Sequence, residues 1–199
     1  MQPAYYENFD EIIKKIWLML NDAVTNRSSQ FRIPVFICGT QNDFDGRIVV
    51  LRKSDQDNNL IQFHSDIRSD KIEKLKTNNR ASLIFYDKEE KIQVRTKVEC
   101  TVNHKNEITE QSWLKTAHIS RKCYLVDNGP GTESVEPTSG LKPEKDNFDY
   151  TMEESEKGYE NFTVIQCKVK SFEWLYLAAK GHRRARFDLE NNKRIWLVP

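Results

Sequence analysis

The pattern of apolar and polar residues predicts one amphipathic helix near the start of the chain. Between residues 9 and 24, five apolar residues recur at helical spacing: Ile13, Ile16, Trp17, Leu20 and Val24. A stripe of this kind usually buries itself against another element. We therefore expect the helix to pack against the strands that follow it.

Short runs rich in β-branched and aromatic residues come next, separated by polar, turn-forming segments. The predicted strands are Phe31–Thr40, Arg47–Lys53, Asn59–Ser65, Ala81–Asp87, Lys91–Cys100 (extending towards His104), Asn161–Phe172, Arg183–Leu189 and Arg194–Val198. Phe172–Ala178 either continues its strand or starts another. Turn residues predict hairpins across three connections: Asn42–Gly46, Asp55–Asn59 and Glu190–Lys193. Many short strands with few helices favour a mainly β, barrel-like fold.

Two further helices and one long loop complete the predicted elements. The first helix follows Ser69 or Asp66, either of which can cap it, and ends at Asn78-Asn79. The second covers Glu107–Ala117. Residues 127–160 are rich in glycine, proline and acids, and they predict a surface loop with one helical turn near Thr151–Glu156. We treat residues 1–199 as a single domain, a size that one core can serve.

Composition limits the possible partners. The 31 basic residues nearly balance the 30 acidic ones, for a net charge of +1. This balance argues against binding to nucleic acid or to an anionic membrane surface, and it suits a local pocket for one small anion. The acidic start lacks a signal-peptide pattern, so we expect a cytoplasmic protein with reduced cysteines.

No motif for a metal or for a known catalytic group is present. The four cysteines form no C-x-x-C pair, and the histidines show no metal spacing and no triad partners. G-x-S-x-G, P-loop and dinucleotide-binding glycine motifs are absent. We therefore predict no metal and leave the catalytic residues unassigned.

Basic and hydroxyl side chains gather around the second predicted strand and the following helix. Arg47 and Arg52 border an apolar strand, and the helix start carries a second group: Ser65, Arg68, Ser69 and Lys71. A helix N-terminus offers free N–H groups and a partial positive charge, so these residues predict a phosphate site. The alternative for Arg68 and Lys71 is an ordinary solvated helix surface.

Four motifs stand in order in this region: R-x-V-V-L-R from Arg47, F-x-S-D-x-R-S-x-K from Phe63, N-N-R-A-S-L-I-F-Y from Asn78 and Q-V-R from Gln93. This series resembles the FMN-binding core of the pyridoxamine 5'-phosphate oxidase-like family. Glu173-Trp174, residues 182–187 and the last four residues resemble the closing segment of that family. The resemblance covers most of the chain from about Phe31, except the middle connection. It implies an FMN-binding split β-barrel that forms a homodimer with FMN at the interface.

The resemblance also implies roles for individual residues. Arg47 and Lys71 match cations that hold the FMN phosphate, and Ser65 matches a hydroxyl contact there. Gln93 and Arg186 match flavin contacts. The other positions assigned to the cofactor are Val49 and Val50, whose backbone lies along the flavin in relatives, Arg52, His64, Arg68, Ser69 and Arg184. Of these, Arg52 replaces a lysine near the flavin and substrate, and Arg184 replaces a histidine used on the substrate.

Some positions depart from the family pattern. Asp70 stands where the oxidase has an arginine, with Arg68 as the candidate replacement, and the family's flavin-side tryptophan falls on Leu175 unless Trp174 substitutes by a shift. The oxidase holds the phosphate of its substrate with a tyrosine, an arginine and a serine. Their counterparts in this chain are Ala117, Arg121 and Leu125. Turnover of pyridoxamine 5'-phosphate should therefore be poor.

The expected function is that of an FMN-dependent oxidoreductase acting by hydride transfer on an unidentified small molecule. A flavin carries its own redox chemistry, so the lack of a catalytic pair is compatible with an enzyme. Two alternatives stay open. One is a flavin-binding carrier or sensor without substantial catalysis, and the other is a true pyridoxamine or pyridoxine 5'-phosphate oxidase. FMN is favoured over FAD because no glycine-rich loop is available for a pyrophosphate.

Overall fold

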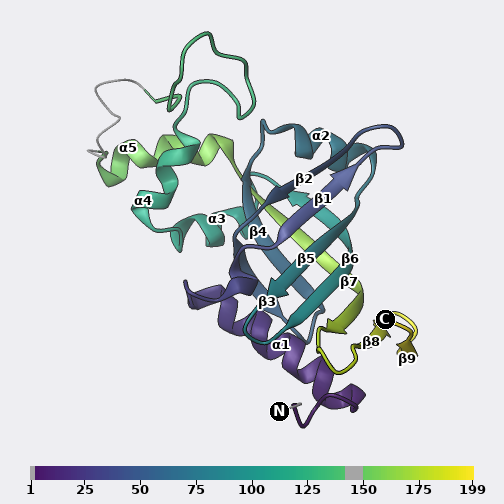
Figure 1. Ribbon diagram of the computed structural model, residues 1–199. Coiled ribbons are helices and arrows are strands. Elements are labelled where there is room, and N and C mark those ends of the chain that lie inside the picture. Colours follow the sequence, from purple (N-terminus) through teal and green to yellow (C-terminus); the bar gives the residue numbers. More distant parts are fainter. Residues whose placement is uncertain (1–2, 142–149) are drawn as a thin grey trace.

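The fold is a β-barrel with peripheral helices, as Figure 1 shows for the computed structural model, which describes residues 3–141 and 150–199. Within these residues, nine strands form one antiparallel sheet. The strands are β1 Val35–Gly39, β2 Phe44–Ile48, β3 Leu51–Asp55, β4 Leu60–Asp66, β5 Arg80–Asp87, β6 Ile92–Asn103, β7 Phe162–Tyr176, β8 Arg183–Asp188 and β9 Lys193–Leu197. The prediction of a mainly β split barrel is confirmed.

The helices are peripheral to the sheet. They are α1 Phe9–Thr25, α2 Asp70–Thr77, α3 Glu107–Leu114, α4 His118–Arg121 and α5 Met152–Glu156, with short 3-10 turns η1 Gln30–Arg32, η2 Lys122–Tyr124 and η4 Lys157–Asn161. Figure 1 shows α2 at one end of the barrel, α1 at the other end, and α3, α4 and α5 together at one side.

The strand order is β2-β1-β5-β6-β7-β4-β3, and β8 pairs with both β7 and β9. The two end strands, β2 and β3, are adjacent in the chain but pair with different neighbours, since Ile48 pairs with Val35 and Leu51 pairs with Phe63. The predicted single strand Arg47–Lys53 is therefore wrong. It breaks at Val49 and Val50, which we call the seam, because the chain there passes from one edge of the sheet to the other.

The predicted N-terminal helix is confirmed as α1. The Asn8 side chain caps it by accepting hydrogen bonds from the N–H groups of Asp10 and Glu11. Its apolar stripe packs on the barrel, where the Trp17 and Phe172 rings meet edge to face with centroids 5.3 Å apart. Each aromatic side chain buried in this way stabilises the fold by roughly 1.5–3 kcal/mol.

The three predicted hairpins are confirmed as β1–β2, β3–β4 and β8–β9. The strand predicted from Phe31 begins only at Val35, because residues 30–32 form η1. Phe172–Ala178 does not start a new strand: β7 runs unbroken from Phe162 to Tyr176.

The helices α3, α4, η2, α5 and η4 form a helical appendage with its own small core: Trp113, Tyr124, Phe162 and Val164. The predicted helix after Asn106 and the helical turn after Thr151 are both present, each with a capping box. The elements α4 and η2 were not predicted. Residues 142–149 of the predicted 127–160 loop lie outside the described residues.

Candidate functional site

A buried lysine with two hydroxyl partners lies where β4 leads into α2. The Lys71 ammonium donates to Ser65 Oγ and Ser69 Oγ, both at 2.9 Å. We call these three residues the cradle. Lys71 is only 8% exposed, and within residues 3–141 and 150–199 no carboxylate pairs with its ammonium. A buried cation without a counter-ion is unfavourable, so the cradle is suited to an anion.

Two effects weaken the hold of Lys71 on its proton. Burial lowers its pKa to about 8, and the nearby Arg47 guanidinium adds to the shift.

Ser69 occupies the N-cap position of α2, but its hydroxyl donates to the Asp66 carbonyl at 2.7 Å and makes no capping bond. The prediction of a side-chain cap from Ser69 is therefore wrong.

Arg47 lies at the rim of the cradle and is partly neutralised. Its guanidinium pairs with Asp45 and, at 2.9 Å, with Asp70. Asp70, the departure from the family pattern, thus orients Arg47. Lys74 pairs with Asp43 at 2.9 Å and with Asp70 at 3.6 Å. The cradle therefore has a charged rim of paired residues around an unpaired buried ammonium.

Arg68 does not join the cradle. Its guanidinium pairs with Asp66 at 2.8 Å and donates to the carbonyls of Val126 and Asp127, both at 3.1 Å. Among the described residues, these contacts tie the start of α2 to the segment that follows η2. The structure therefore places Arg68 in a connecting position and not as a replacement for the arginine lost at position 70.

Arg52 and His64 lie on β3 and β4, next to the seam. Arg52 is the extra residue of a β-bulge, since Leu51 pairs with Phe63 while Lys53 pairs with Gln62. Bulges commonly redirect a side chain at functional sites. Burial, with a contribution from the charge of Arg52, lowers the pKa of His64 to about 3, so its imidazole is neutral at physiological pH.

Arg52 and the seam both have free hydrogen-bonding groups. Arg52 has no hydrogen bond or ion pair within the described part of the chain. At the seam, the N–H of Val49 donates to the Pro34 carbonyl at 3.0 Å, whereas the N–H of Val50 has no partner among the described residues. These groups are available to a ligand.

The remaining predicted residues lie on the outer face of β6, β7 and β8. Three guanidinium groups there contact the Glu173 carboxylate. Arg184 donates to Oε1 at 2.9 Å and 2.5 Å, Arg186 pairs with Oε2 at 3.3 Å, and Arg95 is also in contact. We call these four residues the arginine cluster. Burial alone would raise the pKa of Glu173, but the guanidinium groups outweigh it and lower this pKa.

Strand alternation decides between Trp174 and Leu175. Gln93 and Arg184 are the cross-strand partners of Leu175, so these three residues form one row beside the arginine cluster. Trp174 is fully buried in the barrel, stacks on Tyr176 at 6.2 Å, and leaves its Nε1 without a partner among the described residues. Leu175, and not Trp174, therefore occupies the outward position.

The cradle and the arginine cluster lie far apart within one chain. Ser65 pairs with Thr163 at the start of β7, and Glu173 lies near its other end. At about 3.3 Å per residue, roughly ten residues of strand span on the order of 33 Å. Figure 1 shows α2 and β8 towards opposite ends of the barrel. A single chain thus does not bring all the predicted site residues together.

The predicted substrate-phosphate position is closed. Arg121 is 2% exposed, pairs with Glu156, lies 4.4 Å from the Trp113 ring and donates to the Trp113 carbonyl at 2.9 Å. Ala117 and Leu125, the other two positions, carry no hydroxyl. Arg121 therefore holds the helical appendage together and offers no charge to a ligand.

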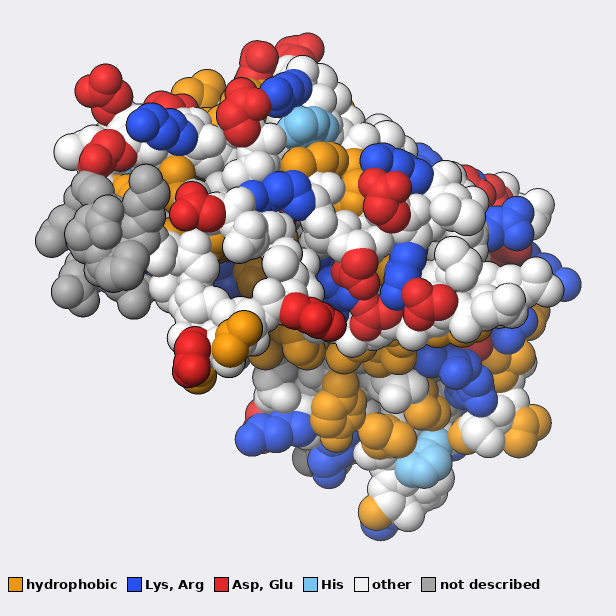
Figure 2. All heavy atoms as spheres, turned by 90° about the horizontal axis from the view of Figure 1, so that it is seen from above, with side chains coloured by type: hydrophobic (Ala, Val, Ile, Leu, Met, Phe, Trp, Pro, Cys, Tyr) orange, Lys and Arg blue, Asp and Glu red, His pale blue; other side chains and the backbone are white. Residues whose placement is uncertain are grey.

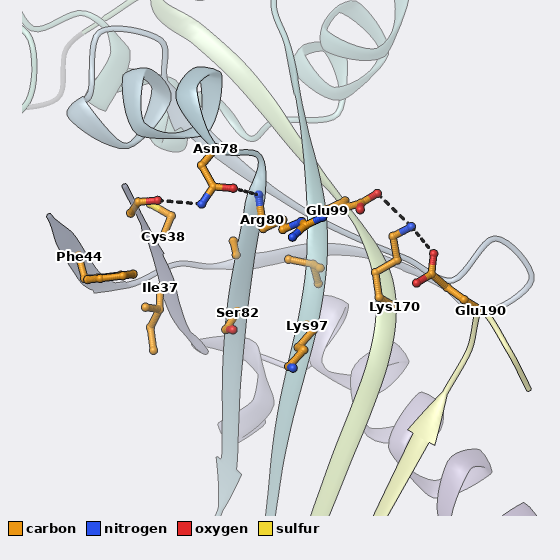
Figure 3. Close-up of a pocket in the computed structure, with 13 residues that line it drawn as sticks. Ile37, Cys38, Phe44, Asn78, Arg80, Ser82, Lys97, Glu99, Lys170 and Glu190 are labelled. Carbon is orange, nitrogen blue, oxygen red and sulfur yellow. Dashed lines mark hydrogen bonds and ion pairs between the residues drawn. The ribbon is translucent and has the colours of Figure 1, made fainter. Parts of the chain in front are cut away.

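A hollow of about 430 Å³ lies on the outer face of the barrel over β1, β5 and β6. Figure 3 shows Phe44 and Ile37 at one side and Lys170 between Glu99 and Glu190 at the other. None of the predicted cofactor residues lines it. Figure 2 shows acidic and basic side chains interspersed at the α2 end, without a single basic field.

No metal site or membrane span emerges from the described residues. No group of three or more His, Cys, Asp or Glu side chains there is placed to hold a metal ion, and no helix there is long and apolar enough to cross a bilayer. All four cysteines are described and none forms a disulfide.

Comparisons with known proteins agree with the observed fold. Residues 15–104 match the family model described as pyridoxamine 5'-phosphate oxidase, FMN-binding domain. No curated protein matches the sequence.

Three solved structures share the fold at low identity. PhzG from Burkholderia lata, solved with tetrahydrophenazine-1-carboxylic acid, has a TM-score of 0.71 at 14% identity, covering 100% of this chain and 98% of its own. A pyridoxamine 5'-phosphate oxidase-related, FMN-binding protein from Nostoc punctiforme has 0.68 at 16%, covering 100% of both chains. A general stress protein 26-related protein from Clostridium acetobutylicum has 0.56 at 12%, covering 90% of this chain and 99% of its own. Residues 15–104 are therefore similar to the FMN-binding domain of the pyridoxamine 5'-phosphate oxidase family, whose cofactor is FMN, and the whole chain shares the fold of these solved structures.

Proposed function

We propose that the protein is an FMN-dependent oxidoreductase that acts on a small molecule by hydride transfer to or from the flavin. The observation that carries the proposal is the buried Lys71 ammonium, whose partners are the two hydroxyls of the cradle. A phosphate monoester supplies the anion that this ammonium lacks, and charge-assisted hydrogen bonds of this kind are the strong ones. The residues of the cradle thus fit the phosphate group of FMN.

Different residues would bind the phosphate of FMN and the remainder of the cofactor. Lys71, Ser65 and Ser69 would hold the phosphate, with Arg47 at the rim. The free N–H of Val50 and the neutral ring of His64 would contact the remainder of the cofactor near the seam. When bound, FMN supplies the redox chemistry, while the protein positions it and excludes water. Arg52, redirected by the bulge, would face the substrate side.

We also propose a two-fold homodimer. The cradle and the two predicted flavin contacts Gln93 and Arg186 lie too far apart in one chain to share a cofactor, so a second copy must supply one of the two groups. Isologous pairing is the commonest way to achieve this. The outer face also exposes apolar side chains that a partner can cover: Phe44 is 73% exposed, Ile48 58% and Tyr86 49%.

Reconstitution with FMN tests both proposals. Flavin titration and sedimentation should give one FMN per chain in a dimer, and the bound flavin should be reduced by a reduced nicotinamide or by a member of a substrate panel. A monomer that holds stoichiometric FMN would contradict the dimer, and binding of FAD alone would contradict the cradle. Tight FMN binding without turnover of any reductant would instead favour the carrier or sensor.

A further inference from the structure

We propose that the arginine cluster recognises an acidic group, a carboxylate or a phosphate, on the substrate of the flavin site. This inference rests on the proposed function and names the class of substrate. The acidic group would be held by Arg95 and Arg184 on the sheet, and not by the helical appendage that the family resemblance points to.

The first support is the charge balance of the cluster. Three guanidinium groups share one carboxylate, which leaves two positive charges in excess. Glu173 is 13% exposed, whereas Arg95, Arg184 and Arg186 are 47%, 27% and 49% exposed. The carboxylate thus lies beneath the guanidinium groups, and the excess charge faces solvent.

The second support is the set of donors left free. Arg184 uses Nε and Nη2 on Glu173, and the other two arginines each use Nη2. Within the described residues, the Nη1 group of each has no acceptor. Because Glu173 fixes the guanidinium groups before any ligand arrives, less side-chain entropy is lost on binding. The cluster is thus preorganised for an oxyanion.

A neighbouring hollow provides room for the body of the substrate. It measures about 590 Å³ and is lined by Arg184 and His182, by Trp196 and Leu197, and by Arg183, whose charge is neutralised by Glu7 at 3.1 Å. The His182 Nδ1 accepts the N–H of Ala178 at 3.1 Å, so in the neutral ring Nε2 carries the hydrogen and is a donor. A compact acid with an apolar ring or chain suits these walls.

The third support is that Arg121, the cation at the predicted substrate-phosphate position, cannot bind an acidic group. Arg121 is the only cation left of the three predicted substrate-phosphate residues, and it is buried and paired with Glu156. Arg121 therefore supplies no counter-charge to an acidic substrate, whereas Arg95 on β6 and Arg184 on β8 can. Arg186 pairs with Glu173 Oε2, whereas Arg95 and Arg184 both pair with Oε1, so these two arginines lie together and would share the acidic group.

Calorimetric titration of the FMN-saturated, full-length protein tests the inference, with benzoate and phenyl phosphate as probes. At least one probe should bind, and Arg95→Gln and Arg184→Gln should each weaken it about tenfold or more. Lys97→Gln is the matched control, because Lys97 is an exposed residue of the same strand without an ion pair among the described residues. The probe that binds more tightly identifies the acidic group.

The inference is overturned if neither probe binds the wild-type protein at millimolar concentration, or if both variants bind as well as the wild type. Thermal unfolding of each variant shows whether it is folded, and Arg184→Lys, which keeps the charge, should retain part of the binding. A separate flavin titration measures FMN binding independently of probe binding. A protein that binds a probe through the cluster but never binds FMN would support the cluster and contradict the proposed function.

Discussion

Lys71 and Arg121 are both buried cations, but only one of them has a carboxylate partner. Lys71 is 8% exposed and its ammonium contacts two hydroxyls, whereas Arg121 is 2% exposed, pairs with Glu156 and lies over the Trp113 ring. Their depth is similar, so burial does not distinguish them. The difference teaches that a buried cation is a candidate ligand site when the fold withholds the counter-charge, and a structural anchor when the fold supplies it.

A substrate with a phosphate group tests most strongly whether Arg121 is a structural anchor. We expect kcat/KM for pyridoxamine 5'-phosphate to be at least about a hundredfold below that of a dedicated oxidase. Ala117 and Leu125 lack the hydroxyls that would bind the phosphate, a loss on the order of 3–6 kcal/mol, and Arg121 is already paired. An oxygen-dependent assay for pyridoxal phosphate with FMN-saturated protein measures this. Turnover equal to that of a dedicated oxidase would show that the residues aligned here are the wrong ones.

Removing the anchor should cost stability and not cofactor binding. Arg121→Ala should lower the free energy of unfolding by about 3 kcal/mol, because carbonyls of the helical appendage lose a buried donor and Glu156 loses its partner. Urea denaturation measures this loss. FMN affinity should be unchanged in the folded variant.

Lys115→Ala is the control, since Lys115 is exposed on the same appendage and should change stability by less than about 0.5 kcal/mol. A stable Arg121→Ala protein that no longer binds FMN would refute the assignment of Arg121 as an anchor.

Removing the Lys71 ammonium, which has no carboxylate partner among the described residues, should weaken FMN binding more than it changes stability. Lys71→Ala should weaken FMN binding about ten- to a hundredfold, since a charge-assisted contact contributes roughly 1.5–3 kcal/mol. Arg47→Ala should weaken it less, because Asp45 and Asp70 already neutralise part of its charge. Flavin fluorescence titration gives both values.

Lys76→Ala provides the matched control, because Lys76 lies on the same helix but pairs with Glu73 at 2.7 Å. Its FMN affinity should equal that of the wild type. If Lys71→Ala binds FMN as tightly as the wild type does, the phosphate does not lie in the cradle.

The smallest expected effect is a pH dependence of FMN affinity. The pKa of Lys71 is lowered to about 8 in the free protein, and a bound phosphate favours the charged form and raises it again. Affinity should therefore be full below pH 8 and fall as pH rises above 8, by up to about tenfold per pH unit. Titrations between pH 7 and 9.5 measure this fall, and Lys71→Met should show a flat profile. An equally steep fall in that variant would assign the effect to another group.

Much of the fold could be predicted from periodicity and turn chemistry. Alternating apolar residues and turn segments indicated the hairpins, and the predicted helix over Glu107–Ala117 and helical turn near Thr151–Glu156 are present as α3 and α5. The break at Val49 and Val50 could not be predicted in this way, because β-branched residues favour a continuous strand. Long-range pairing separates the two strands, since β2 pairs with β1 and β3 pairs with β4 at the opposite end of the sheet.

The candidate site was predictable in its residue types more than in its geometry. The order of the motifs pointed to Lys71 and Ser65, which the structure brings into contact. Nothing local could show that Arg68 turns towards residues 126 and 127, or that Arg121 finds a carboxylate 35 positions further along the chain. These pairings depend on how loops return to the barrel, which local patterns do not encode. The arginine cluster was also missed as a unit, although its i, i+2 spacing on β8 was a usable signal.

The seam makes the barrel an open cylinder, held together along one line by the chain and not by hydrogen bonds between β2 and β3. Such a cylinder should be most compliant at its slit. Amide protons on the outer edges of β2 and β3 should therefore exchange with deuterated water sooner than those of β6 and β7, which are paired on both sides. A cofactor bound along the seam would then link the edges of β2 and β3. Slower amide exchange at these edges after FMN is added would show which residues it stabilises.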